Sequence, residues 1–173
     1  MIKNEKQYNY SKDCASRFAY SITIVEKDEA WKQRDAEGWQ MDIDVKKSHL
    51  MALQEEIYEY ERLNNCDKKQ PIKIQVESFN KLPDVLIKAR IAANISQKEL
   101  ADILDIEEER IKECEKTDYQ CASFLELLNV SEALGVEFKN AFVEVNFEEI
   151  EEFKKVAAEF HQKQQKYKII AEY

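Results

Sequence analysis

The stretch "ISQKELADILDIEEERIKECEK", residues 95–116, predicts two short helices that cross at a tight turn. Ser96 is followed three residues later by Glu99, a capping box in which each side chain accepts a hydrogen bond from the other residue's backbone N–H. This pair opens the first helix, "QKELADIL". Asp105 stands where that helix must end, because Asp tolerates the left-handed conformation that such a turn often requires.

Small and aliphatic residues around the turn predict how the two helices pack. Ala101 allows the crossing helices to approach closely, Ile106 is expected to be buried at the turn, and Ile111 anchors the second helix. Similar patterns predict four to five short helices over residues 81–136, with Pro83 in the first helical turn. The expected apolar anchors are Leu86, Ile91, Leu100, Ala101, Ile106, Ile111, Leu125, Leu128 and Leu134.

Residues 1–70 carry two amphipathic patterns that predict an N-terminal helical hairpin. One helix is expected over about residues 12–34, and the second has Leu50, Leu53 and Ile57 along one side. Gly38 marks the expected break between them. Such a stripe serves either as a packing face within the chain or as a dimer interface. Residues 71–80 alternate apolar and polar side chains, which favours a short strand or an extended connector.

Residues 137–173 predict a short extended segment followed by a long amphipathic helix. The stretch "VEFKNAFVEVNF" is rich in β-branched and aromatic residues. Asn146 followed by Glu149 is typical of a capping box at a helix start. The apolar side of this helix must be buried, on this chain or on a second subunit. It consists of Ile150, Phe153, Val156, Ala157, Phe160 and Tyr167.

Composition limits the class of protein. Only two glycines and two prolines among 173 residues predict a mainly α fold, and a net charge of −9 argues against nonspecific coating of nucleic acid. No stretch approaches the roughly 20 apolar residues of a membrane span, and no signal peptide is visible, so we expect a cytoplasmic protein without membrane contact. The four cysteines form no CxxC pair, so we expect reduced thiols and neither metal nor other cofactor. They are Cys14, Cys66, Cys114 and Cys121.

Residues 82–136 resemble a Cro/CI-type helix-turn-helix of the XRE family. The matching positions are Ser96, Gln97, Glu99, Leu100, Ala101, Ile106, Ile111 and Glu115, together with "SFLELLNVSEALGV". More narrowly, "LIKARIAANISQKELADIL", "ERIKECEKTDY" and the beginning "MIKNEKQY" are similar to a HigA-like group of bacterial regulators. The resemblance covers most of residues 1–136, with a weaker match over 31–44, and excludes the last helix. It implies sequence-specific DNA binding, usually by dimers, in regulators that include antitoxins of toxin-antitoxin pairs.

By position, the resemblance implies three kinds of DNA contact. Donors at the start of the first motif helix hold a phosphate, one side of the recognition helix enters the groove, and residues just beyond reach the backbone. The residues at these positions are Gln97, then Glu108, Glu109, Arg110 and Lys112, then Lys116, Thr117 and Tyr119, and the DNA-binding hypothesis adds Lys98 as a contact to the DNA backbone. The implied partners are operator DNA of its own promoter, a second copy of the chain, and a protein such as a cognate toxin.

Glu107, Glu108 and Glu109 depart from the family, whose members usually carry polar or basic residues there. Residues 79–135 contain seven basic and twelve acidic side chains, whereas most DNA-reading domains are basic. Carboxylates in a first helical turn each stabilise the helix by about 0.3–1 kcal/mol through its dipole, which explains them without DNA. Three of them would weaken specific binding without abolishing it, because each costs on the order of 1 kcal/mol at about 5 Å from a phosphate.

Two functions therefore stay open. One is a dimeric, antitoxin-like DNA-binding autorepressor, with Arg110 as the best candidate for bidentate contact with guanine. The other is an acidic interaction module of helix-turn-helix fold that sequesters a basic toxin or nucleic-acid-binding protein without binding DNA itself. We expect no enzyme, since no nucleophile, base and orienting group can be assembled, and His49 and His161 are expected at surface or packing positions.

Overall fold

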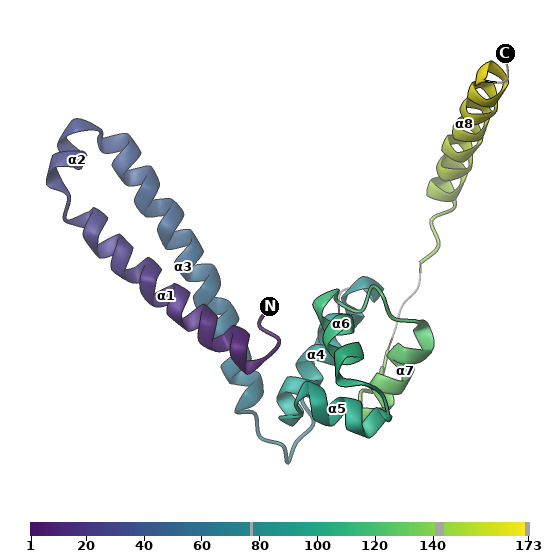
Figure 1. Ribbon diagram of the computed structural model, residues 1–173, viewed down its shortest axis with the longest axis horizontal. Coiled ribbons are helices and arrows are strands. Elements are labelled where there is room, and N and C mark those ends of the chain that lie inside the picture. Colours follow the sequence, from purple (N-terminus) through teal and green to yellow (C-terminus); the bar gives the residue numbers. More distant parts are fainter. Residues whose placement is uncertain (77, 141–143, 172–173) are drawn as a thin grey trace. The chain divides into compact units, whose positions relative to one another are not determined.

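The computed structural model describes residues 1–76, 78–140 and 144–171, with the backbone alone for residues 162–171. The described residues form helices and no strand, so the prediction of a mainly α protein is confirmed. The chain divides into two units, residues 1–137 and 138–173. The helices are α1 (Glu5–Glu26), α2 (Glu29–Arg34), α3 (Ala36–Asn64), the 3-10 turn η1 (Phe79–Lys81), α4 (Leu82–Ala93), α5 (Gln97–Leu104), α6 (Glu108–Lys116), α7 (Phe124–Ala133) and α8 (Phe147–Ala171) (Figure 1).

In the first unit, α1 and α3 lie side by side and α2 joins their far ends (Figure 1). Gly38 does not mark the break, contrary to our expectation, because it lies in the first turn of α3. The break is made instead by Asp28 and Asp35, whose side chains cap α2 and α3. A Cβ at Gly38 would stand 2.2 Å from Asp35 Oδ2, so the glycine leaves room for the capping carboxylate.

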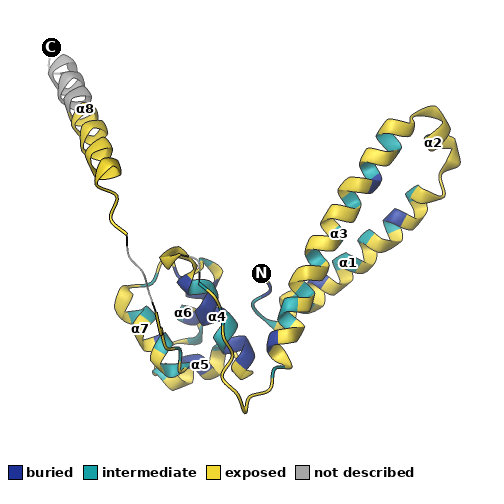
Figure 2. Cartoon of the chain, turned by 180° about the vertical axis from the view of Figure 1, so that it is seen from behind, coloured by how far each residue is buried: buried dark blue, intermediate teal, exposed yellow. Residues whose placement is uncertain are grey.

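The core of the first unit lies where α4–α7 meet the end of α3. Its buried residues include Leu63 of α3 and five of the expected anchors, which are Leu86, Ile91, Leu100, Ala101 and Ile111. Figure 2 shows this concentration of buried residues in α4–α6. Three other anchors were predicted wrongly, because Ile106, Leu125 and Leu128 are 42%, 65% and 50% exposed.

These errors have local causes. In α7 the buried side is turned towards Val130, which is 2% exposed and belongs to the core, with Leu127 and Leu134 half-buried beside it. At the turn, the backbone N–H of Ile106 donates to the carbonyl of Ala101 at 3.0 Å. Ile106 therefore closes the turn with its backbone while its side chain stays at the surface.

The predicted helix boundaries around the turn are confirmed in detail. Ser96 and Glu99 form both bonds of the capping box that opens α5. Asp105 ends α5 in the left-handed conformation, with φ 54°. Pro83 stands in the first turn of α4. A second capping box, Ser123 with Glu126, opens α7.

The segments outside the helices carry less structure than the patterns suggested. Residues 71–76 and the described part of 137–146 form neither helix nor strand, while 141–143 of the expected extended segment lie outside the described residues. The carboxamide oxygen of Asn146 accepts from the backbone N–H of Glu148 and Glu149, at 3.1 and 3.3 Å, and so opens α8. Among the described helices, none combines the length and the apolar character needed to cross a membrane.

Candidate functional site

A buried ion pair joins α4, α5 and α6. Arg90 Nε lies 2.5 Å from Glu115 Oε1, and Arg90 Nη2 donates to Glu115 Oε2 at 2.7 Å. The side chains are only 5% and 1% exposed. Gln97 Nε2 at the start of α5 donates to the same carboxylate at 2.7 Å, and Arg90 also donates to the carbonyl of Ile95 at 2.8 Å. The pair is thus saturated with hydrogen bonds, as a buried charge requires.

The first residues of the chain attach to this pair. Arg90 Nη2 donates to the carbonyl of Lys3 at 2.6 Å. Lys3 Nζ in turn donates to the carbonyl of Glu115 and, at 2.6 Å, to Asp118 Oδ1. Its ammonium group therefore sits at the carbonyl end of α6, where a cation is favoured by the helix dipole. Ile2 beside it is 3% exposed, which fixes the segment against the body.

A cleft of about 780 Å³ separates this N-terminal segment from α5 and α6. Basic residues outnumber acidic ones in its lining, although the chain as a whole carries a charge of −9. The basic residues are Lys3, Lys6, Arg90, Lys98, Lys112 and Lys116, and the acidic ones are Glu5, Glu99, Glu108 and Glu115. Lys6, Lys98 and Lys116 are exposed. We call this cleft, which Gln97 also lines, the lysine cleft.

The predicted DNA-contacting residues divide between this cleft and other places. Five of them line the lysine cleft, namely Gln97, Lys98, Glu108, Lys112 and Lys116. Glu109 projects from α6 with its side chain 82% exposed. Arg110, Thr117 and Tyr119 are not part of the cleft lining. Sequence reasoning missed Lys3 and Lys6, because only tertiary packing brings the first residues of the chain to α5 and α6.

Lys112 and Lys116 are the cations that α6 contributes to the lysine cleft, and Lys112 is held by two carboxylates. Its Nζ lies 2.6 Å from Glu109 Oε1 and 3.1 Å from Glu108 Oε1. The hydrogen bond that Lys112 donates to Glu109, followed by the one to Glu108, raises the pKa of Lys112. Pairs between exposed side chains are weak and screened by salt. A phosphate can therefore replace either carboxylate as the partner of Lys112.

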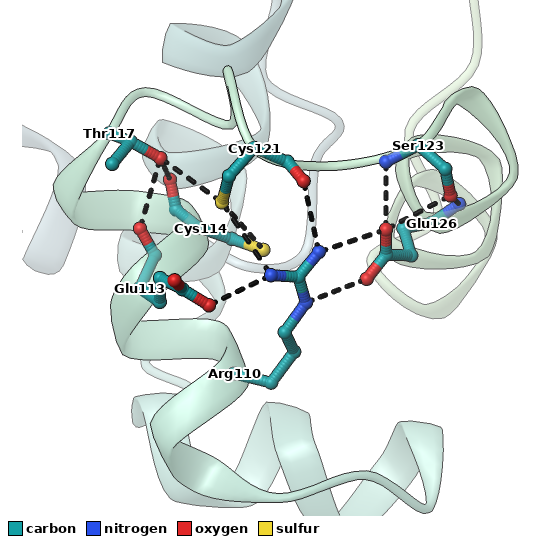
Figure 3. A network of polar contacts seen from close by, with 7 residues as sticks. All are labelled: Arg110, Glu113, Cys114, Thr117, Cys121, Ser123 and Glu126. Carbon is teal, nitrogen blue, oxygen red and sulfur yellow. Dashed lines mark hydrogen bonds and ion pairs between the residues drawn. The ribbon is translucent and has the colours of Figure 1, made fainter.

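Arg110 points to the start of α7 rather than into the lysine cleft (Figure 3). Its Nε and Nη2 donate to the two carboxylate oxygens of Glu126 at 2.8 and 3.1 Å, Nη1 donates to Glu113 Oε2 at 2.8 Å, and Nη2 also donates to the carbonyl of Cys121 at 3.0 Å. The guanidinium of Arg110, with the backbone N–H of Ser123, lowers the pKa of Glu126 to about 2. Arg110 is thus a structural tie between α6 and α7.

The residues just beyond α6 also point inward. Tyr119 is 3% exposed, so the expectation that its side chain reaches a DNA backbone is wrong. Burial raises its pKa, and its hydroxyl has no hydrogen-bond partner among the described residues. Thr117 Oγ1 donates to the carbonyls of Glu113 and Cys114, at 3.1 and 3.3 Å, and closes the end of α6. No sequence pattern indicated this inward turn.

The described side chains hold no cluster of three or more His, Cys, Asp or Glu residues that could bind a metal ion. The chemistry that the site offers is consequently that of lysine ammonium groups and amide donors arranged around an open cleft, which suits a polyanion. Comparison of the chain with protein-family models, with curated proteins and with solved structures finds no match.

Proposed function

We propose that this protein is a sequence-specific DNA-binding transcriptional regulator in which α5 and α6 act as a helix-turn-helix. The observation that carries the proposal is the lysine cleft, where side chains from α5, α6 and the N-terminal segment gather positive charge on an otherwise acidic chain. The capped start of α5, the left-handed Asp105 and the buried Ala101 support it, because this motif needs two short helices crossing closely at a tight turn.

Phosphate contacts would be made by the exposed lysines of the cleft. Lys98 lies in the first turn of α5, Lys116 in the last turn of α6 and Lys6 in the first turn of α1, and all three line the cleft. The acidic charge elsewhere on the chain weakens such contacts little, because exposed charges more than about 10 Å apart are largely screened at ordinary salt. Steep dependence of affinity on salt follows, since each neutralised phosphate releases counterions.

Lys112 replaces Arg110 as our candidate for contact with base edges. To reach a guanine, Arg110 would have to give up both bonds to Glu126, its bond to Glu113 and its bond to the carbonyl of Cys121. Lys112 would exchange only exposed carboxylates for its new partner. Glu108 lines the same cleft, and in this proposal its carboxylate accepts from a cytosine amino group.

The proposed regulator is a dimeric, antitoxin-like autorepressor. The resemblance to HigA-like regulators supports this role, and so does the apolar side of α8, whose described large side chains are exposed. A cognate toxin is the corresponding protein partner. We also propose a cytoplasmic location, where its operator would be.

The test is fluorescence anisotropy with DNA from upstream of the protein's own gene, at several salt concentrations. Replacing Lys6, Lys98 and Lys116 by Gln is expected to lower affinity and to reduce the slope of log K against log salt by about three, or about one for each phosphate that is no longer neutralised. A matched control replaces Lys12, Lys27 and Lys47, which are exposed on or beside the α1–α3 hairpin. If the control variant binds as weakly as the cleft variant, binding does not run through the lysine cleft.

A second function is favoured by the surface of α6 itself. Both of its central cations are already paired with carboxylates, while Glu109 and Glu113 are 82% and 60% exposed. An acidic module that holds a basic protein would present such a helix. This second function requires that the purified chain fails to bind its promoter DNA at low salt and forms a complex with a small basic protein encoded beside its gene. Binding of the wild-type chain to that DNA would exclude it.

A further inference from the structure

Two cysteines lie side by side on the side of α6 that carries Arg110. Cys114 belongs to the last turns of α6, Cys121 follows in the loop before α7, and their Sγ atoms are 3.9 Å apart (Figure 3). Cys114 is 2% exposed, whereas Cys121 is exposed. One sulfur thus meets solvent, and the other meets mainly the protein and its neighbouring thiol.

The turn between them brings the two sulfurs together. The backbone N–H of Tyr119 donates to the carbonyl of Cys114 at 2.6 Å, and that of Gln120 donates to the carbonyl of Thr117 at 3.0 Å. Asp118 and Tyr119 are consecutive non-glycine residues with positive φ, 49° and 56°. Such a backbone is unfavourable, and it persists only where its surroundings hold it. Here the buried ring of Tyr119 and the ion pair between Asp118 and Lys3 do so.

The exposed sulfur is itself positioned. Thr117 Oγ1 lies 3.3 Å from Cys121 Sγ, and Arg110 Nη1 donates to this sulfur at 3.7 Å. Arg110 is held in turn by Glu126 and Glu113. The Cys121 side chain is therefore directed at Cys114 by groups that are anchored elsewhere in the fold.

We propose that Cys114 and Cys121 form a reversible intramolecular disulfide when the protein meets a hydroperoxide. The bonded sulfurs of a disulfide are about 2.05 Å apart, so an approach of roughly 2 Å is needed. Side-chain rotation, with a small movement of the 117–121 turn, supplies it. The bond would tie the end of α6 to the loop that leads into the capping box of α7.

The chemistry assigns a different role to each sulfur. The Cys121 thiolate attacks a peroxide oxygen, the O–O bond breaks, and Cys121 becomes a sulfenic acid while hydroxide leaves and takes up the thiol proton as water. The Cys114 sulfur then attacks the sulfenic sulfur, the S–O bond breaks, and the departing hydroxyl takes the Cys114 proton as a second water. Two thiols lose two electrons in total, and hydrogen peroxide is reduced to two waters.

Burial prevents Cys114 from reacting first, so that it takes part only in the second step. Desolvation, followed by the hydrogen bond between the two thiols, raises the pKa of Cys114 to about 12. It therefore remains a thiol that reacts slowly with peroxide in solution. Its sulfur reacts once the sulfenic acid is formed 3.9 Å away, where the local concentration of electrophile is high.

The test treats the reduced full-length protein with hydrogen peroxide, unfolds it, blocks remaining thiols with N-ethylmaleimide and digests it with trypsin. Cleavage after Lys112 and Lys116 places the two cysteines in separate peptides, residues 113–116 and 117–139. The expected product is these two peptides joined and lighter by two hydrogens, with Cys14 and Cys66 blocked by maleimide. Dithiothreitol is expected to restore four blocked cysteines.

Three variants make the result decisive. The double variant Cys14→Ser with Cys66→Ser is the control and should form the link as the wild type does. Cys121→Ser, at an exposed position, should abolish it. Cys114→Ser should stop the reaction at a Cys121 sulfenic acid that dimedone traps, with circular dichroism showing that the variant is folded. A link between two chains, a link to Cys14 or Cys66, or a Cys121 sulfinic acid in the wild type without any link would overturn the proposal.

Discussion

The pair of Arg90 and Glu115 is the most deeply buried charge contact among the described residues. Its members are 5% and 1% exposed, and they gather Gln97, Ile95 and Lys3 around them. Removal of one partner from such a pair leaves an uncompensated charge in the core, whereas removal of both does not. The pair therefore fixes the arrangement of α4, α5 and α6 and attaches the first residues of the chain to them.

We expect Arg90→Leu and Glu115→Leu each to lower the free energy of unfolding by about 3–5 kcal/mol, because each strands a buried charge. The double variant should be destabilised by clearly less than the sum of the two. Urea denaturation of the four proteins in a double-mutant cycle measures this coupling. The exposed pair of Lys112 and Glu109 is the control, for which the same cycle should give little coupling. Additive effects at Arg90 and Glu115 would refute the role assigned to the pair.

Glu126 should contribute to the loss of stability in acid. Its hydrogen bonds with Arg110 and Ser123 lower its pKa from 4.5 to about 2 in the folded protein. A lowered folded pKa stabilises the protein fully above the unfolded value, and this stabilisation is lost as the pH falls from about 4.5 towards 2. Glu126→Gln should be less stable than the wild type at pH 7 and should lose less stability on acidification. Thermal denaturation of both proteins at pH 7 and pH 3 measures the difference, and equal losses of stability would contradict it.

Helix ends set the boundaries of the short helices that frame the lysine cleft. The capping boxes of Ser96 with Glu99 and Ser123 with Glu126 open α5 and α7. Left-handed residues close α4 and α5, at Asn94 with φ 57° and Asp105 with φ 54°. These ends are local in sequence, and they keep α5 and α6 short enough to cross at the turn.

The left-handed end of α5 can be tested by comparing the stability of an Ala and a Gly variant at Asp105, and then at Asp102 inside the helix. The order of stability should be opposite at the two positions. Asp105→Ala should be less stable than Asp105→Gly by about 1 kcal/mol, because a Cβ is unfavourable at positive φ. Asp102 is exposed inside α5, where the helix favours Ala. Asp102→Gly should therefore be less stable than Asp102→Ala by a similar amount. Urea denaturation of the four variants compares them. The same order at both positions would show that Asp105 is not held in this conformation.

The unit of residues 138–173 leaves an apolar helix side uncovered. Phe147, Phe153, Val156 and Phe160 of α8 are 74%, 72%, 64% and 59% exposed. The α1–α3 hairpin of the other unit also shows apolar side chains, among them Met41 and Val45, which line a shallow groove on α3. Both surfaces are candidates for the proposed dimer contact, and the larger side chains favour α8.

Light scattering coupled to size-exclusion chromatography separates the two surfaces. We expect a dimer for the wild type and a monomer for Phe153→Lys combined with Phe160→Lys, because an apolar interface offers no partner to the charges that these substitutions would bury. Met41→Lys combined with Val45→Lys is the matched variant on α3, and it should remain a dimer. If the α3 variant alone becomes a monomer, the hairpin forms the interface instead.

Features of the fold that depend on residues close together in the sequence were predicted correctly more often than features that depend on packing. Helix class, the capping box at Ser96, the side-chain cap at Asn146 and the left-handed Asp105 followed from residues within one turn of each other. The break between the helices of the hairpin was wrongly assigned to Gly38. A glycine can mark a break, but it can also leave room for a neighbouring side chain, as Gly38 does for the capping carboxylate of Asp35. The buried side of α7 was also misjudged, because apolar residues occupy more than one side of it and only packing selects Val130.

The sequence by itself determined that this is a mainly α protein, where α5 begins and ends, and where α4 and α8 begin, because capping and periodicity act over a few residues. Only the tertiary structure decided which side chains of α6 face the cleft and which pack against the rest of the fold. It turned Arg110 towards Glu126 and Lys112 into the lysine cleft, and it brought Lys3 and Lys6 to residues more than 90 positions away in the chain. Side-chain direction and long-range proximity depend on how all the elements pack together, which no local pattern encodes.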